Sequence, residues 1–407
     1  MNMQKIVQRR TMFLLTAVLL TGILLASCGS GNTATTTKKP SPVATHTLQP
    51  TPTPIPTHEP TATPDPAPTY PPVVSPASTL GIVADTQHPF TGIPWVRLGY
   101  KTCFGNTQGQ GLKDTIAMFH SRGVRVMLSL CQWATDTRLY NTNIMNDAAA
   151  GGADAVQCGN EQMKAGRYNS YVPPAIFARF FYMCQRAVHL VRPEVPVIIG
   201  ANDPQVGGTD YGPLYAQVNY LNSMQYYMNT SVLNHGNWSW RSQAVGLIDS
   251  WHNGYPGSGV NSLYYLFLFW AQQFGVDANS GALGKHLWVI EGTGCIFGCG
   301  IATDTHSIAV SHILTLITDV QTSMHYKVPF FYFSARDFYS QGSYWPMGVR
   351  DGNDHPKPLR QDLWMGARTL TLSCSSGSTN VSSQEQLLAK MYSGCSLPGN
   401  YASILES

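Results

Sequence analysis

Charged side chains are scarce in this 407-residue sequence. Asp, Glu, Lys and Arg make up 12% of it, the formal net charge is +3, and no basic patch with interleaved aromatic residues occurs. Because nucleic-acid-binding proteins gather positive charge on one face, we expect no nucleic-acid partner. The Cys295 and Cys299 pair also lacks a second cysteine or histidine pair at the spacing of a zinc site. We therefore expect neither a metal nor a cofactor.

The N-terminus has the pattern of an export signal. Positively charged residues precede a short apolar run, Met12 to Leu25, which is less than a comfortable bilayer span. The run ends in Leu-Ala-Ser before Cys28, which resembles the lipobox of bacterial lipoproteins, where the cysteine is lipidated. This resemblance implies a signal peptide over residues 1–27 and an extracytoplasmic, cell-surface protein held to the membrane by its lipid anchor alone. An ordinary signal peptide and a secreted product are the alternative.

Residues 28–75 are dominated by Thr, Pro, Ser and Ala and contain almost no aliphatic bulk. Such a segment buries too little apolar area to offset the entropy of ordering it, and its prolines favour extended conformations. We expect a disordered linker that separates the anchor from a globular domain.

Cysteine usage agrees with export. Apart from Cys28, eight cysteines remain, an even number as expected in an oxidising compartment. Their connectivity is open at this stage. We favour a disulfide between Cys374 and Cys395, because it would fasten a C-terminal tail over residues 371–407 that is rich in Ser and Gly.

The globular part alternates strand-like apolar runs with helical ones, as βα units around a parallel sheet do. The expected strands are residues 80–84, 95–98, 124–130, 155–158, 197–200, 247–251, 287–290 and 330–333. The expected helices begin near Leu112, Pro174, Leu263 and Ile308, with a short one after Pro358. Eight strands predict an α/β fold, a closed (β/α)8 TIM barrel over residues 76–370. An open doubly wound sheet is the alternative, although no glycine-rich nucleotide turn favours it.

In such a barrel the chemistry lies at the carboxyl ends of the strands. Polar residues occur in or directly after four of the expected strands. They are Arg97 in the second, Asn160 and Glu161 after the fourth, His252 after the sixth and Glu291 after the seventh.

An Asn-Glu pair after strand four and a lone Glu after strand seven resemble the retaining glycoside hydrolases of clan A, the barrel enzymes that include cellulases, mannanases and xylosidases. The similarity extends to "VPVIIGAND" as strand five, His252, and "GVRDGNDHPKP" before the last helix. It implies Glu161 as general acid/base, Glu291 as nucleophile, and Asn160 as a hydrogen-bond partner of the sugar hydroxyl next to the reacting carbon.

The residue chemistry supports the same assignment. Retaining hydrolysis needs two carboxyl groups about 5–5.5 Å apart, and strands four and seven face each other across a barrel mouth. Arg97 is suited to hold the nucleophile ionised, or else pairs with a structural acid. Other candidate substrate-binding residues are polar groups that orient the nucleophile and flat rings on which sugars stack. They are His252, Tyr255, Trp251, Tyr332 and Trp345.

Two departures from the clan pattern stand out. Gln162 occupies the place where clan members usually have proline, and Phe333 the place where many have tryptophan. We expect a monomeric retaining glycoside hydrolase acting on a polysaccharide or oligosaccharide by double displacement. A surface glycan-binding lipoprotein without catalysis, and a transglycosylase, are the alternatives.

Overall fold

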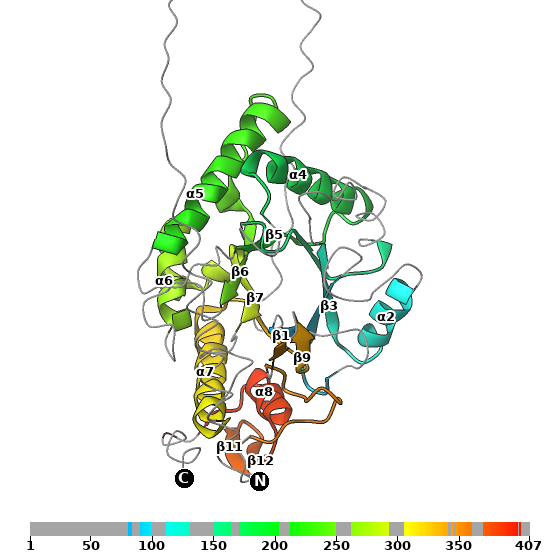
Figure 1. The fold of residues 1–407 in the computed structure, drawn as a ribbon, viewed down its shortest axis with the longest axis vertical. Helices are drawn as coiled ribbons and strands as arrows, with labels where there is room; N and C mark the ends of the chain where they lie inside the picture. Colours follow the sequence, from blue (N-terminus) through cyan, green and yellow to red (C-terminus); the bar gives the residue numbers. More distant parts are fainter. Residues whose placement is uncertain are drawn as a thin grey trace, which may run out of the picture. The chain divides into compact units, whose positions relative to one another are not determined.

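The computed structural model describes most of the globular part of the chain (Figure 1). The described residues are 80–83, 90–99, 111–130, 150–163, 171–202, 212–249, 262–292, 305–340, 343–345, 347–359, 369–397 and 399. The expected signal peptide, the linker and Cys28 lie outside them, as does the short helix expected after Pro358.

Eight parallel strands form a closed barrel, in which each strand pairs with its neighbours along the chain and the first pairs with the eighth. They are β1 (Leu80–Val83), β2 (Trp95–Gly99), β3 (Arg125–Leu130), β4 (Ala155–Cys158), β5 (Val197–Asn202), β6 (Ala244–Asp249), β7 (Leu287–Gly292) and β8 (Phe330–Tyr332). The TIM barrel expected from the sequence is confirmed, and closure excludes the open doubly wound sheet.

Helices surround the strands (Figure 1). They are α2 (Gly111–His120), α4 (Pro174–Val191), α5 (Gly212–Tyr227), α6 (Ser262–Phe274) and α7 (Thr305–Tyr326), with α8 (Gln384–Tyr392) after the barrel. Short helical turns are η3 (Met228–Val232), η4 (Trp240–Ser242), η5 (Ala278–Ser280) and η6 (Leu283–Lys285). Proline at the first position suits the start of α4, because a helix leaves that N–H unpaired in any case. Within the described ranges, no helix combines the length and apolar character needed to cross a membrane.

Two layers of apolar side chains hold the barrel. One lies between strands and helices, and the other fills the interior, since successive strand residues point to opposite faces. The interior layer consists of Trp95, Met127, Ala155, Ile198, Ala244, Ile248, Trp288, Ile290 and Phe331. Trp95 contacts Trp288 edge-on, with ring centroids 6.4 Å apart. Since Trp95 is the first residue of β2, the next side chain of that strand to face the interior is Arg97.

The connection between β1 and β2 is short, as the sequence indicated. Its described part, residues 90–94, contains no helix, yet Phe90 and Ile93 are buried. The Arg350 guanidinium lies over the Phe90 ring, 4.2 Å from its centroid. The described segment before β2 is therefore a partly buried loop in place of a helix, and the Arg350 side chain covers its Phe90 ring.

Two hairpins follow the barrel strands: β9 (Phe338–Ser340) with β10 (Ser343–Trp345), and β11 (Leu370–Cys374) with β12 (Gly377–Val381). Cys374 and Cys395, the pair favoured from the sequence, form a disulfide bond. In α8, the Tyr392 hydroxyl donates to the Gly81 carbonyl oxygen of β1 at 2.7 Å. Residues 370–397 thus contribute the β11–β12 hairpin and a helix that contacts the barrel.

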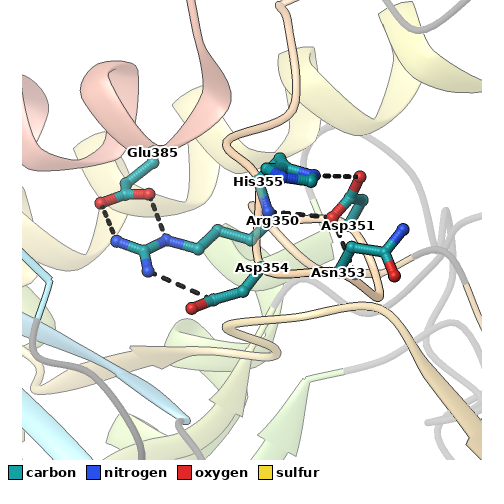
Figure 2. Close-up of polar contacts among 6 residues, drawn as sticks. All are labelled: Arg350, Asp351, Asn353, Asp354, His355 and Glu385. Atoms are coloured by element: carbon teal, nitrogen blue, oxygen red, sulfur yellow. Dashed lines mark hydrogen bonds and ion pairs between the residues drawn. The ribbon is translucent and has the colours of Figure 1, made fainter.

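An ion-pair cluster ties this C-terminal helix to the segment that follows β10 (Figure 2). Arg350 Nε and Nη2 donate to the two carboxylate oxygens of Glu385 at 2.6 and 2.7 Å, and Nη1 donates to Asp354 at 3.2 Å. Hydrogen bonding to Glu385 raises the pKa of Arg350. Beside it, the Asp351 carboxylate accepts the backbone N–H of His355 at 2.9 Å, which closes a turn. These contacts fix the "GVRDGNDHPKP" segment against α8.

Candidate active site

Arg97 is the centre of a polar cluster inside the carboxyl end of the barrel. Its side chain is 6% exposed. Nη1 donates to Glu291 Oε1 at 2.7 Å, and Nη2 donates to Asn160 Oδ1 at 2.8 Å. Nε donates to Gln157 Oε1 at 2.8 Å, while Nη2 also reaches Ser129 Oγ at 3.2 Å. One guanidinium therefore joins residues from β2, β3, β7 and the end of β4.

The inward position of Glu291 depends on an irregularity in β7. Ile290 already belongs to the interior layer, so simple alternation would turn Glu291 to the outer face. The pairing register of β7 shifts on both sides, against β6 and against β8. Such a bulge lets the chain re-aim a side chain, and the Glu291 carboxylate, 15% exposed, reaches Arg97. Bulges of this kind are common next to active sites.

The chain turns sharply immediately after β4. Gly159 and Glu161 have φ angles of 100° and 49°. The left-handed region costs a non-glycine residue about 1–2 kcal/mol, so the conformation of Glu161 requires support from its surroundings. Asn160 gives part of it, because its Oδ1 accepts from Gln157 Nε2 at 3.1 Å as well as from Arg97. Glu161 is half-buried and directly follows Asn160, which accepts a hydrogen bond from the same Arg97 guanidinium as Glu291.

Gln157 and Ser129 take part in this cluster although sequence reasoning did not select them. Both are buried polar residues that directly precede the last residue of a mostly apolar strand. Gln157 Nε2 also donates to the Gly159 carbonyl oxygen at 2.6 Å, which supports the turn before Glu161. A polar residue one or two positions before the end of an apolar barrel strand is the signal that would have identified them.

Tyr332 does not offer the open ring face expected for sugar stacking. It is fully buried, and its hydroxyl donates to the Met347 carbonyl oxygen at 2.8 Å. Burial raises the pKa of Tyr332 well above its ordinary value. The next residue, Phe333, is half-buried and packs edge-on against Phe338, with ring centroids 5.6 Å apart. The half-buried ring of Phe333 thus follows β8 directly, at the position where clan members often have tryptophan.

A buried ion pair supports the hairpin beyond β8. Asp337 Oδ1 accepts from Lys357 Nζ and from the Gly348 N–H, both at 2.8 Å, and Asp337 Oδ2 accepts from the Tyr344 hydroxyl at 2.7 Å. Burial lowers the pKa of Lys357, whereas burial and the bond to Asp337 raise that of Tyr344. Trp345 pairs with Phe338 in the hairpin register. The hairpin that carries Trp345 is therefore held at the carboxyl end of β8.

Three of the expected substrate-binding residues, Trp251, His252 and Tyr255, lie outside the described residues. So do Cys295 and Cys299. In the part of the chain that the structure describes, no three His, Cys, Asp or Glu side chains are grouped as metal ligands. The cluster brought together there consists of Arg97, Asn160 and Glu291, with Gln157 and Ser129.

Comparisons with known proteins give distant structural similarities. No protein-family model and no curated protein sequence matches this chain. A family 17 β-1,3-glucanosyltransferase from Rhizomucor miehei is 16% identical, with a TM-score of 0.43 over 70% of this chain and 97% of that one. A family 39 glycoside hydrolase from Bacteroides cellulosilyticus WH2 is 12% identical, with a TM-score of 0.44 over 75% and 68%. A glucosidase from Croceicoccus marinus is 10% identical, with a TM-score of 0.47 over 71% and 66%.

These solved structures are glycoside hydrolases or glucanosyltransferases. At identities of 10–16% and TM-scores below one half, the similarities carry no activity over to this chain. The function of this chain is therefore defined by the residues of the site itself.

Proposed function

We propose that this protein is a retaining glycoside hydrolase that cleaves a polysaccharide or oligosaccharide by double displacement. The observation that supports this most is the Arg97 guanidinium, bonded to Glu291 at 2.7 Å and to Asn160 at 2.8 Å. The planar guanidinium thereby links the ends of β7 and β4. Of the two proposed catalytic residues, Glu291 belongs to β7 and Glu161 follows β4. Retaining glycosidases require two catalytic carboxyl groups about 5–5.5 Å apart, and the second one proposed here belongs to Glu161, the residue after Asn160.

Glu291 acts as the nucleophile. Its Oε1 is held by Arg97, which orients the carboxylate toward the anomeric carbon that it attacks. Glu161 acts as the general acid and transfers its proton to the departing glycosidic oxygen. In the second step Glu161, now a carboxylate, takes a proton from water, which displaces Glu291 from the same carbon and restores the original anomeric configuration. Asn160 donates its amide N–H to the sugar hydroxyl next to the reacting carbon.

The two roles are separable by experiment. Glu291→Gln is expected to abolish hydrolysis and to prevent a covalent glycosyl-enzyme, while substrate binding survives. Glu161→Ala is expected to lower kcat/KM for glycosides with poor leaving groups by about 10²–10⁴-fold and for activated aryl glycosides far less, because a phenolate leaves without a proton in the first step. Its glycosyl-enzyme then accumulates, and azide accelerates turnover by attacking without a base.

Glu194→Gln serves as the control variant, since it neutralises an exposed carboxylate that also lies 2.7 Å from an arginine nitrogen. It is expected to leave all rates unchanged. Wild-type rates in both Glu161→Ala and Glu291→Gln would refute the catalytic assignment. A wild type that binds glycans but cleaves none supports the surface-lectin alternative, and a product in which the sugar is passed to a second sugar supports the transglycosylase.

A further inference from the structure

A buried pair of amide side chains anchors the chain directly after Glu161. Gln162 and Asn202, the last residue of β5, are both fully buried, and Gln162 Nε2 donates to Asn202 Oδ1 at 2.8 Å. The Gln162 carbonyl oxygen also accepts the Val172 N–H at 2.8 Å. We call the Gln162 and Asn202 pair the amide clamp.

Strand β5 is shaped to receive this clamp. A Cβ atom on Gly200 would lie 2.3 Å from Gln162 Oε1 and 2.8 Å from the Gly159 carbonyl carbon. The pairing register of β5 against β6 shifts between Ile199 and Ala201, on either side of that glycine. Only glycine therefore leaves room for the Gln162 amide and for the turn that begins at Gly159.

The chain before Glu161 is anchored independently. Cys158, the last residue of β4, forms a disulfide bond with Cys184 of α4, and both are fully buried. Between this disulfide and Gln162 lie only Gly159, Asn160 and Glu161. Since two of these three residues have left-handed φ angles, the turn depends on fixed ends.

The clamp is a poor device for stability alone. Gln162 Oε1 and Asn202 Nδ2 are buried and have no hydrogen-bond partner among the described residues. A buried polar atom without a partner opposes folding, and two apolar side chains of similar size would avoid that cost. What the clamp does supply is a directional bond between the residue after Glu161 and the end of the neighbouring strand.

We propose that the Gln162 and Asn202 clamp positions Glu161 for proton transfer to the departing sugar. The inference rests on the proposed function, in which Glu161 is the acid/base. The clamp residues are positioning residues: they hold the backbone from which the Glu161 carboxyl extends. Proton transfer requires hydrogen-bond geometry at the leaving oxygen, so a displaced turn weakens this step more than nucleophilic attack by Glu291.

The test uses two variants that remove the directional bond from either side, Gln162→Met and Asn202→Leu. The control is Gln185→Met, which breaks another buried amide pair, in which Gln185 Nε2 donates to Gln243 Oε1 at 3.1 Å. Gln243 directly precedes the first residue of β6, so this pair lies toward the amino end of the barrel, whereas Glu161 follows the carboxyl end of β4. The measured quantities are kcat/KM on a phenyl and on a dinitrophenyl glycoside of the sugar that the wild type cleaves, together with the melting temperature.

Both clamp variants are expected to lose about 10- to 100-fold in kcat/KM on the phenyl glycoside, whereas kcat/KM for the dinitrophenyl glycoside stays close to wild type, because kcat/KM reports the first step, in which dinitrophenolate leaves without a proton. Their melting temperatures stay within about 3 °C of wild type. Gln185→Met is expected to show no difference between the two substrates. A merely structural role would change the melting temperature without this dependence on the leaving group.

Equal losses on both substrates, no loss, or the same split in Gln185→Met would overturn the proposal. So would failure of both clamp variants to fold while Gln185→Met folds, because the clamp would then serve stability. Glu161→Ala, measured in parallel, distinguishes a failure of the proposed function from a failure of the clamp proposal. If Glu161→Ala itself lacks the leaving-group dependence, the proposed function is wrong; if it shows the dependence and the clamp variants do not, only the clamp proposal is wrong.

Discussion

Replacing Arg97 by Met tests whether the polar cluster is held together by a buried ion pair. The Arg97 and Glu291 side chains are only 6% and 15% exposed, so the water that screens surface pairs is largely excluded. Removing one partner of a buried pair typically costs about 3–5 kcal/mol, against about 0–1 kcal/mol for an exposed pair. Arg97→Met also removes the Arg97 donors of Gln157 Oε1 and Asn160 Oδ1. We expect it to lower the free energy of unfolding by about 4 kcal/mol.

A double-mutant cycle isolates the charge from the packing. Glu291→Gln removes the negative charge but keeps a hydrogen-bond acceptor, so the double variant Arg97→Met, Glu291→Gln contains no unpaired buried carboxylate. We expect it to recover at least about 1.5 kcal/mol relative to the sum of the two single effects. Urea unfolding gives the midpoints and slopes, and an unchanged slope shows that the compared states are the same.

The exposed pair of Arg192 and Glu194 provides the control, because its Nε to Oε1 distance is also 2.7 Å while the Glu194 side chain is 60% exposed. Glu194→Gln is expected to have no measurable effect on unfolding. A loss below about 1 kcal/mol in Arg97→Met, or strict additivity with Glu291→Gln, would show that the buried-charge reasoning is wrong.

Three further predictions concern the disulfide, two half-buried histidines and the anchor. Cys374→Ser removes a crosslink between residues 21 apart and is expected to cost about 3 kcal/mol of unfolding free energy, whereas equal stability of oxidised and reduced wild type would contradict this. Burial lowers the pKa of His189 and of His286 below the ordinary 6.5, so the unfolded chain binds protons more tightly and stability is expected to fall as the pH drops below about 6.5. His189→Gln reduces that pH dependence in urea unfolding, and an unchanged dependence would count against it. We propose that Cys28 is lipidated, so wild type partitions into membranes and Cys28→Ser is released or left unprocessed; a soluble wild type that begins elsewhere would disprove the anchor.

Most of the barrel was predictable, because its strands are short apolar runs separated by helical ones. The ranges expected for β4 and for the start of β2, β5, β7 and β8 agree with the structure. The start of β6 was placed three residues late, because Gly246 interrupts the apolar run; in the barrel it is needed, since a Cβ there would lie 2.5 Å from the Gly200 carbonyl oxygen. Helix α5 escaped prediction because it buries Gln217 and exposes Tyr226, which blurs its apolar face.

The sequence by itself determined which residue types stand at the strand ends, since the order of apolar runs and polar residues along the chain is local information. Arg97, Asn160 and Glu291 could therefore be selected. Only the tertiary structure decided that the Arg97 guanidinium bonds both Asn160 and Glu291. This requires barrel closure and the shifted register of β7, which turns Glu291 inward. It likewise decided that Tyr332 is a core residue and that Gln162 bonds Asn202 across forty residues of chain. Contacts of this kind depend on which strands become neighbours, and no local pattern records them.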